Sequence, residues 1–459
     1  MDVALIRLPC PRVFPLGIAY LATAIHRRKP DLKIGIVDLA LTTSENCKRQ
    51  LQNVLNQKPK HILLSWRDIQ ILSPNEFDPS LANVMLWWYG KGLEKWKAGM
   101  ESWKAYRAYQ DLLKQNLSLI EYMAKERSLI LGGPAANVFG LWLKQLLPAN
   151  VKIMRPQQES LIIQQITGTS NPVSIDELTF DLSWLLSIWP EGEKYAKSVI
   201  GIRTKQGCTK GCIFCVYPFL ERTTDYKSRS IIVDEIRQSV KHLSASTFWF
   251  ADAQSLDTQK CHEEFTDLLK RIKKLKIGWS GYLRWDNITP DLAQIMVASG
   301  MNDIEVSIAS GSQQVVDRMN IQLDLKKTLK GLALVKKAGF KNRFYVNLSF
   351  NAPGETKETI KETVRWWKRA QKTISKEQLV PVIFFIGIQP HTKFVGMLQE
   401  NGYLPQNWNP LSLNPLTAKK LLYNPGSLGR ELGQLFAEVA GQNRTNRGQA
   451  FMQRLEAMT

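Results

Sequence analysis

Short apolar segments of strand length alternate with helical segments along most of this 459-residue chain, and this alternation limits its fold more than any other feature. In the N-terminal third the strand-like runs are Val3–Leu8, Lys33–Leu39, His61–Ser65, Ser128–Leu131 and Val151–Met154. Segments with helical apolar spacing, such as Leu16–Ile25, separate them. Because apolar strands that alternate with helices pair in parallel, we predict an α/β fold that begins with a Rossmann-like, doubly wound sheet over residues 1–168.

A long insertion rich in aromatic side chains, residues 73–125, lies between the third and fourth of these strands. Trp96 and Trp103 stand seven residues apart, and Trp103, Tyr106 and Tyr109 repeat at every third position. This spacing predicts an amphipathic helical hairpin. Its aromatic residues either pack as core or form a wall for a planar ligand, and the sequence leaves both open.

Polar and glycine residues follow the strands of this first domain, at the edge where doubly wound sheets bind ligands. The residues that we predict to bind a cofactor there are Ser65, Trp66, Gly132, Gly133 and Glu159. Two adjacent glycines let a backbone approach a large flat ligand closely, although ordinary turn chemistry is the alternative explanation.

A second series of strands and helices follows a linker at residues 169–197 and runs over residues 198–394. Its candidate strands are Ser198–Ile202, Thr247–Ala251, Gly278–Leu283, Asp303–Ile308, Phe344–Phe350 and Val382–Ile388. Six strand–helix repeats predict a partial (β/α)6 barrel of TIM type, whose chemistry lies at the carboxyl ends of the strands. Residues 395–459 form a small region that is helical around Leu428–Ala440, and the polar segment Gln442–Gln449 is expected to be mobile.

Three cysteines, Cys208, Cys212 and Cys215, follow the first of these strands within one loop. Three thiolates this close can converge on one metal centre, and three ligands on a 4Fe-4S cluster leave one iron open for a substrate or cofactor. A structural zinc site is the alternative, but it needs four ligands, and the nearest following histidine is His242. We therefore predict an iron–sulfur cluster.

The remaining cysteines and the net charge indicate which cellular compartment and which partners to expect. Cys10, Cys47 and Cys261 are scattered, which favours a reducing, cytoplasmic compartment over a disulfide framework. The formal net charge of +20 permits an anionic partner, but the lysines are spread over many predicted helices, so we expect solvated helix faces rather than nucleic-acid binding. We expect neither a signal peptide nor a membrane-spanning helix.

The cysteine loop, with Phe214 just before its last cysteine, resembles the signature of radical S-adenosylmethionine (SAM) enzymes. The doubly wound domain before it resembles the cobalamin-binding domain of one subgroup, so the resemblance covers about residues 1–395. It implies three cofactors, namely a 4Fe-4S cluster, SAM and cobalamin, and an external electron donor of the flavodoxin or ferredoxin type. It also implies that the C-terminal region closes over the substrate.

The resemblance assigns roles to individual residues. Cys208, Cys212 and Cys215 would ligate the cluster, and the backbone of Phe214 would lie against the adenine of SAM. At the strand ends, the further residues predicted to contact SAM are Asp252, Arg284, Ser310 and Gly311, of which Asp252 is also a catalytic candidate.

Two departures from the family pattern stand out. Relatives usually carry an acidic residue where this chain has Ala309, so a contact to SAM is lost. No histidine follows an aspartate at the spacing that many cobalamin proteins use to ligate cobalt from below. Arg67, after the third strand, is our candidate for a cation that keeps water from cobalt, with a surface or salt-bridged arginine as the alternative.

The resemblance implies a cobalamin-dependent radical SAM methyltransferase that acts on an unactivated or aromatic carbon of a small molecule or peptide. Similarity to the tryptophan C-methyltransferase of thiopeptide biosynthesis leaves a polar transfer open. An oxidative cyclase or another radical enzyme, and a non-catalytic iron–sulfur or cobalamin-binding regulator, are the alternatives.

Overall fold

The computed structural model describes residues 1–67, 81–221, 223–412, 414, 420, 422–423 and 428–458. The chain forms two compact units, each built from segments far apart in the sequence. Unit 1 consists of Met1–Leu72, Asp111–Cys208 and Phe219–Asp252, and unit 2 of Ser73–Gln110, Thr209–Pro218 and Ala253–Thr459. The domain limits predicted above stay a prediction.

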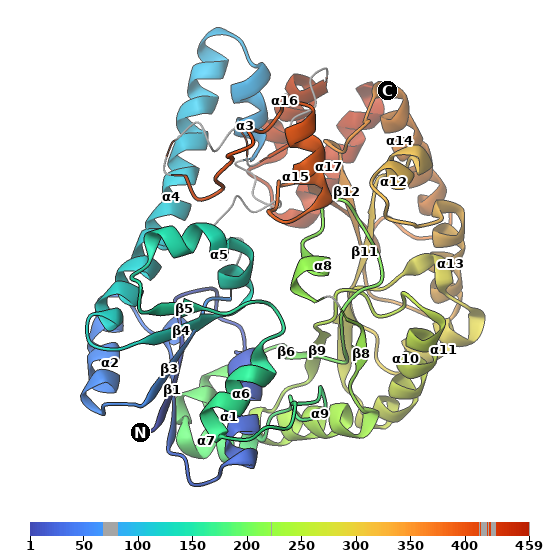
Figure 1. The fold of residues 1–459 in the computed structure, drawn as a ribbon. Helices are drawn as coiled ribbons and strands as arrows, with labels where there is room; N and C mark the ends of the chain where they lie inside the picture. Colours follow the sequence, from blue (N-terminus) through green and yellow to red (C-terminus); the bar gives the residue numbers. More distant parts are fainter. Residues whose placement is uncertain are drawn as a thin grey trace. The chain divides into compact units, whose positions relative to one another are not determined.

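A five-stranded sheet in the order β2-β1-β3-β4-β5 forms the centre of unit 1 (Figure 1). Its strands, all parallel, are β1 (Val3–Arg7), β2 (Ile34–Asp38), β3 (His61–Ser65), β4 (Leu129–Gly132) and β5 (Val151–Ile153). All five residues of β1 are buried, as expected for a strand with a neighbour on each side and helices on both faces. The chain order reverses between β1 and β3, so the predicted doubly wound sheet is confirmed, with its topological switch point there.

Helices connect these strands and continue beyond β5. They are α1 (Leu16–Arg28), α2 (Ser44–Asn56), α5 (Pro134–Leu146), α6 (Glu159–Thr167), α7 (Leu182–Ile188) and α9 (Arg229–Leu243). Helix α1 packs against α6, and α5 packs against β4 and β5. Unit 1 also holds the parallel pair of β6 (Ile200–Ile202) with β9 (Thr247–Phe250), and the antiparallel pair of β7 (Lys205–Gln206) with β8 (Asp225–Tyr226).

The aromatic insertion is a helical hairpin in its described part, as predicted: α3 (Leu81–Tyr89) is followed by α4 (Gly92–Ala124). Residues 73–80 of the predicted insertion lie outside the described residues. The aromatic side chains differ in environment, since Tyr106 is 5% exposed whereas Trp96 is 63% exposed. Core packing therefore explains only some of them.

Unit 2 carries the later strands and helices of the barrel series. Its strands are β10 (Gly278–Gly281), β11 (Ile304–Ala309), β12 (Phe344–Ser349) and β13 (Leu379–Phe384), and the last three pair in parallel in that order. Helix α10 (Gln259–Ile272) precedes β10, and the helices between these strands are α11 (Pro290–Ala298), α12 (Gln313–Arg318), α13 (Leu325–Lys337) and α14 (Lys357–Gln371).

The last strand, β13, corrects the prediction, because it begins three residues earlier and ends four residues earlier than the expected Val382–Ile388. Pro381 lies inside it, paired with Val346 of β12. A proline is tolerated here because β13 is at the edge of its sheet among the described residues, where one row of backbone N–H groups faces no described strand.

The C-terminal region is helical, with α15 (Lys393–Glu400), α16 (Gly429–Val439) and α17 (Arg444–Met458). Helix α16 packs against α3 of the insertion, and α17 packs against α14, α16 and β13. The expectation of a mobile segment at Gln442–Gln449 is wrong, because α17 begins within it and buries Phe451, Met452 and Leu455 to 1% exposure or less.

Candidate functional site

The cysteine loop, residues 208–215, is held by hydrogen bonds on its N-terminal side within unit 1. The Gly207 N–H donates to Oε2 of Glu221 (2.7 Å), and Nζ of Lys205 donates to the Gly207 carbonyl (3.1 Å). Gly207 has a φ of +79°, and a Cβ there would lie 2.2 Å from the carbonyl oxygen of Thr223. Only glycine fits at this entry to the loop.

The C-terminal side of the loop is fixed within unit 2. The Ile213 N–H donates to the Met319 carbonyl (3.1 Å), and the Phe394 N–H donates to the Ile213 carbonyl (2.9 Å). Nδ2 of Asn320 donates to the Gly211 carbonyl (2.8 Å). The backbone around the second and third cysteines is therefore set by two short segments, one after α12 and one at the start of α15.

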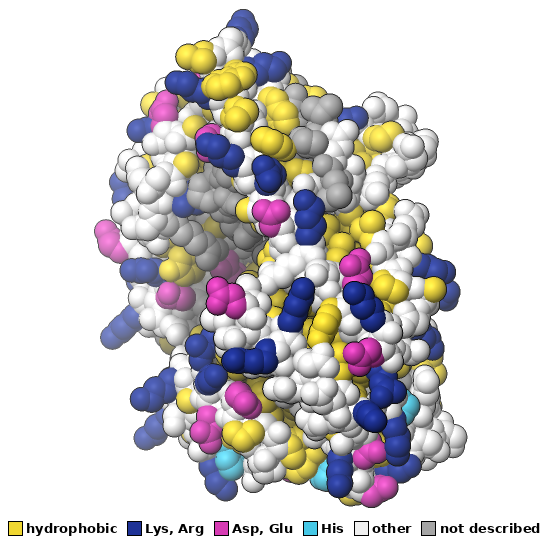
Figure 2. Space-filling view, turned by 90° about the vertical axis from the view of Figure 1, so that its left-hand side faces the viewer, with side chains coloured by type: hydrophobic (Ala, Val, Ile, Leu, Met, Phe, Trp, Pro, Cys, Tyr) yellow, Lys and Arg dark blue, Asp and Glu magenta, His cyan; other side chains and the backbone are white. Residues whose placement is uncertain are grey.

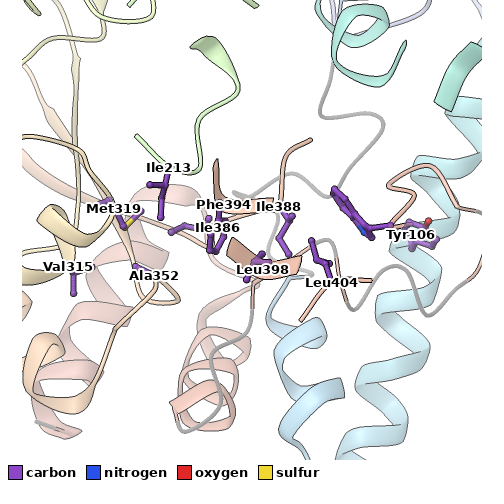
Figure 3. Packing of buried hydrophobic residues seen from close by; sticks show 12 residues of the cluster. Tyr106, Ile213, Val315, Met319, Ala352, Ile386, Ile388, Phe394, Leu398 and Leu404 are labelled. Carbon is purple, nitrogen blue, oxygen red and sulfur yellow. The ribbon is translucent and has the colours of Figure 1, made fainter. Parts of the chain in front are cut away.

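A buried apolar cluster lies beneath this side of the loop, and Figure 3 shows its members. Ile213 of the loop packs there with Met319, Phe394 and Ile386, and Phe214 packs against the same cluster. Ala352, three residues beyond β12, also belongs to it. The cluster thus joins the cysteine loop to the carboxyl end of β12.

The three cysteines themselves are partly exposed and form no disulfide. Among the residues that the structure describes, no group of three or more Cys, His, Asp or Glu side chains stands ready to hold a metal ion. The hydrogen bonds described above fix the backbone that carries these three thiols.

A row of polar side chains lies on one face of β11 and β12, opposite the fully buried Val306 and Val346. Nδ2 of Asn347 donates to Oε2 of Glu305 (2.9 Å) and to Oγ of Ser307 (3.1 Å). Oδ1 of Asn347 and Oγ of the neighbouring Ser349 are buried and have no partner among the described residues. Two unsatisfied polar atoms on one face indicate a place for hydrogen-bonding groups of a ligand.

Sequence reasoning missed this row, because a strand residue that binds a ligand looks like any other polar residue in an alternating strand. The one available signal was polar side chains, Glu305, Ser307, Asn347 and Ser349, at every second position of strands otherwise rich in valine, isoleucine and leucine.

The predicted residues at the strand ends have other partners. The carboxylate of Asp252, 3% exposed, accepts from the backbone N–H groups of Thr204 (2.8 Å) and Lys205 (3.1 Å) and from the Thr204 hydroxyl. Arg284 forms an ion pair with Asp286, with Nε 2.6 Å from Oδ1. Asp252 thus ties the end of β9 to the segment after β6, and Arg284 pairs within its own segment. Their roles toward SAM stay predictions.

Ser310 and Gly311 face helix α14. Ser310 is fully buried with its hydroxyl 3.2 Å from that of Thr363, and the Gly311 N–H donates to the same Thr363 hydroxyl (3.0 Å). Just before them the strand register shifts between Ser307 and Ala309, and Ala309 has a φ of +60°. Such a bulge redirects the chain at the end of a strand, and it lies where the resemblance to radical SAM enzymes leads us to expect an acidic residue.

In unit 1 the predicted residues come together at the carboxyl edge of the sheet. The Leu8 N–H donates to the Ser65 carbonyl (3.0 Å), and the Trp66 N–H donates to the Gly132 carbonyl (2.9 Å). Gly133, with a φ of +95°, packs against Trp66 so closely that a Cβ would lie 2.5 Å from its carbonyl oxygen. Turn geometry alone therefore requires Gly133, and its approach to a ligand stays a prediction.

Other residues at this edge differ in exposure and partners. Arg67 is exposed, and Glu159 is partly exposed at the start of α6. Three side-chain atoms are buried without a partner in the described part of the chain, namely Nε1 of Trp66, Oδ1 of Asn116 and Oδ1 of Asn137. Asn116 also reaches the loop after β1, where its Nδ2 donates to the Pro9 carbonyl (3.5 Å). Asn116 and Asn137 lie inside helices, so nothing in the sequence pointed to them.

The loop after β12 holds a buried acid, Glu355, that is 9% exposed. Its Oε1 accepts from the Thr359 hydroxyl (2.6 Å), and its Oε2 has no partner among the described residues. Burial raises the pKa of Glu355 to about 7. The hydrogen bond from Thr359 lowers this pKa, and the repulsion from Glu362 raises it further. The other residues around its small hollow are apolar or glycine: Met85, Phe350, Leu428, Gly429 and Leu432.

The sequence was compared with protein families and with curated proteins. Residues 202–366 match the family described as the radical SAM superfamily. The chain contains a radical SAM domain. Curated relatives include tRNA-2-methylthio-N(6)-dimethylallyladenosine synthases from Bacillus licheniformis, 22% identical over 236 residues, and Desulfosudis oleivorans, 23% identical over 234 residues. The first alignment covers 46% of this chain and 45% of the relative, and the second 50% and 47%, so the chain spans about half the length of these relatives.

Solved structures resemble the radical SAM domain together with the sheet that precedes it. TsrM from Kitasatospora setae, a radical SAM methyltransferase with cobalamin and a 4Fe-4S cluster bound, matches over 100% of both chains with a TM-score of 0.68 and 12% identity. OxsB, a cobalamin-dependent SAM radical enzyme, matches 95% of this chain and 65% of its own with a TM-score of 0.65 and 14% identity. The predicted fold class, a doubly wound sheet followed by a barrel-like radical SAM region, is confirmed.

The surface and the helices add two findings. Lysine and arginine side chains are scattered over the face in Figure 2, with acidic side chains among them, as expected for solvated helix faces. None of the described helices combines the length and the apolar composition needed to cross a bilayer.

Proposed function

We propose that this protein is a cobalamin-dependent radical SAM methyltransferase that methylates a carbon atom of a small molecule or peptide. The observation that supports this most is the match to TsrM over the full length of both chains, because it includes the sheet of unit 1 as well as the radical SAM domain. The proposed cofactors are a 4Fe-4S cluster, SAM and cobalamin.

The residues present fit these groups. Cys208, Cys212 and Cys215 provide three thiolates on a backbone that is already fixed, which leaves one iron of a cluster open to SAM. The unpartnered atoms of Asn347 and Ser349 suit the amino and hydroxyl groups of SAM. At the edge of the unit 1 sheet, the unpartnered side-chain atoms of Trp66 (Nε1), Asn116 (Oδ1) and Asn137 (Oδ1) suit the amide side chains of a corrinoid.

When bound, the reduced cluster would supply electrons for reductive chemistry on SAM, and cobalamin would carry the methyl group between SAM and the substrate. The loop cysteines would hold the cluster, and the face with Glu305 and Asn347 would orient SAM. An external one-electron donor of the flavodoxin or ferredoxin type would reduce the cluster.

Arg67 is the candidate for control of the cobalt. Its exposed guanidinium forms no ion pair with a described residue, and it follows β3 at the topological switch point. A cation there would disfavour a water ligand on cobalt. We expect Arg67→Ala to change the cob(II)alamin EPR spectrum toward a water-bound form, with Arg67→Lys close to the parent. Unchanged spectra in Arg67→Ala would remove this role.

The whole proposal is tested with protein reconstituted anaerobically with iron, sulfide and cobalamin, then given reductant and methyl-labelled SAM. S-adenosylhomocysteine together with labelled methylcobalamin is the expected result. Cys212→Ser should lack the cluster, whereas Cys47→Ser, a buried cysteine in α2, serves as the matched control and should keep it.

The alternatives give other products. 5′-Deoxyadenosine without methyl transfer would favour an oxidative cyclase or another radical enzyme. A protein that binds the cluster but leaves SAM intact would be a regulator, and one that binds no corrinoid would refute the cobalamin assignment.

A further inference from the structure

Asp257 lies between β9 and α10, and it is 5% exposed. Its Oδ2 accepts from the backbone N–H of Thr209 (2.9 Å) and from the Thr209 hydroxyl (3.0 Å). Thr209 directly follows Cys208 in the chain. A side chain from another loop therefore holds the segment between the first and second cysteines.

Cys261 holds the other oxygen of the same carboxylate. Its thiol, 1% exposed, donates to Oδ1 of Asp257 (2.8 Å). Thr258, which caps the N-terminus of α10, accepts from the Cys261 N–H and donates to its sulfur, at 3.1 Å in each case. The thiol is thus directed at Asp257 by the first turn of the helix.

These contacts account for a buried carboxylate that would otherwise be costly. Burying a charge is unfavourable unless hydrogen bonds satisfy it, and the donors to Asp257 include Thr209 N–H, Thr209 O–H and Cys261 S–H. The two donors of Thr209 belong to the cysteine loop, so the loop and the carboxylate fix each other.

A negative charge beside an iron–sulfur cluster opposes the addition of an electron. Net charge and hydrogen bonding around a cluster are among the factors that set its reduction potential. Asp257 bonds to Thr209, the residue next to a cluster ligand, and its carboxylate is itself buried, so its charge is screened less than that of an exposed acid.

We propose that Asp257 is a positioning residue of the cluster site. Its carboxylate, oriented by the thiol of Cys261, fixes Thr209 and lowers the reduction potential of the cluster. This rests on the proposed function for the cluster itself, but the anchoring of Thr209 is a property of the protein without it.

Asp257→Ala tests the anchor in the cluster-free protein. Removing the acceptor of the Thr209 N–H should raise its hydrogen-exchange rate about five- to tenfold, the effect expected for one lost hydrogen bond. The amide of Ile213, bonded to Met319, is the internal control and should keep its rate. An unchanged rate at Thr209 in folded protein would overturn the anchoring.

Asp257→Asn tests the charge in the reconstituted protein, because it preserves size and removes the negative charge. An EPR-monitored redox titration should place the cluster midpoint at a more positive potential than in the parent. Cys261→Ser keeps a donor to Asp257 and should retain the parent potential, and Cys47→Ser controls for loss of a buried thiol. An unshifted midpoint in Asp257→Asn would overturn the charge effect, and loss of iron in Cys261→Ser would make Cys261 a ligand instead.

Failure of the proposed function gives a different result from failure of the Asp257 anchor. A parent protein that takes up no cluster refutes that function before any variant is made, while the exchange experiment still tests the anchor.

Discussion

Glu355 provides a sharp test of how burial acts on stability in unit 2. Its pKa rises from the ordinary 4.5 to about 7 on folding, with desolvation as the main cause. In the unfolded chain the carboxyl ionises from pH 4.5 upward, while in the folded protein it stays protonated until about pH 7. The folded state therefore loses stability across this window as pH rises, by a total of about 3 kcal/mol.

Glu355→Gln removes this loss because the side chain cannot ionise. We expect the variant and the parent to have similar free energies of unfolding near pH 4.5. The variant should become progressively more stable than the parent up to pH 7, by about 3 kcal/mol at most, and the difference should level off above it. Chemical denaturation of the cluster-free protein at a series of pH values, followed by tryptophan fluorescence, measures this.

Glu358→Gln is the matched control, since Glu358 lies three residues beyond Glu355, in the first turn of α14, but is exposed and ion-paired with Lys361. Its profile should lack the rising advantage between pH 4.5 and 7. If the free energy of unfolding of Glu355→Gln follows that of the parent throughout this pH range, the inference that the buried carboxyl is neutral is wrong. Glu355 would then titrate in the folded protein as it does in water.

Three further predictions concern other parts of the structure. Lys227 and Glu235 form a fully buried ion pair (2.8 Å), in which burial lowers the pKa of the lysine and raises the pKa of the acid. Lys227→Met should lower the free energy of unfolding, measured by chemical denaturation, by about 3–5 kcal/mol. The double variant with Glu235→Leu should recover much of this lost stability. Gly207→Ala should reduce the iron bound after reconstitution, because a Cβ collides with the backbone of Thr223, and full iron content would refute this. Phe451→Ala in α17 should destabilise unit 2 by about 3–5 kcal/mol, whereas loss of under about 1 kcal/mol would mean that α17 is loosely packed.

The fold was largely predictable because the spacing of apolar residues along the sequence indicates which side of each strand or helix is buried. Each strand of the five-stranded sheet matches a predicted apolar run to within a few residues, and the aromatic spacing of the insertion predicted α3 and α4. The errors arose where long-range contacts decide. The proline of β13 is acceptable only at a sheet edge, and α17 is ordered only because β13 and α16 cover its apolar side.

The candidate site was predictable where the chemistry is local in sequence, as in Cys208, Cys212 and Cys215. Asp257 and Asn347 could not be found in the same way, because their partners are 48 residues away in one case and 40–42 in the other. Gly133 and Gly311 were expected to face a ligand, but backbone packing against Trp66 and Thr363 already requires small residues there.

Helix α17 has a consequence for handling this protein. It lies against β13, and Nε2 of Gln449 donates to the carbonyl of Leu379 (2.8 Å), a group on the open edge of a parallel sheet. An uncovered edge strand is a template for pairing with other chains. Proteolytic cleavage before Arg444, or a bulky fusion that displaces this helix, would therefore expose the edge of β13 and make the protein aggregate. This would happen even with every residue proposed to bind a cofactor still in place.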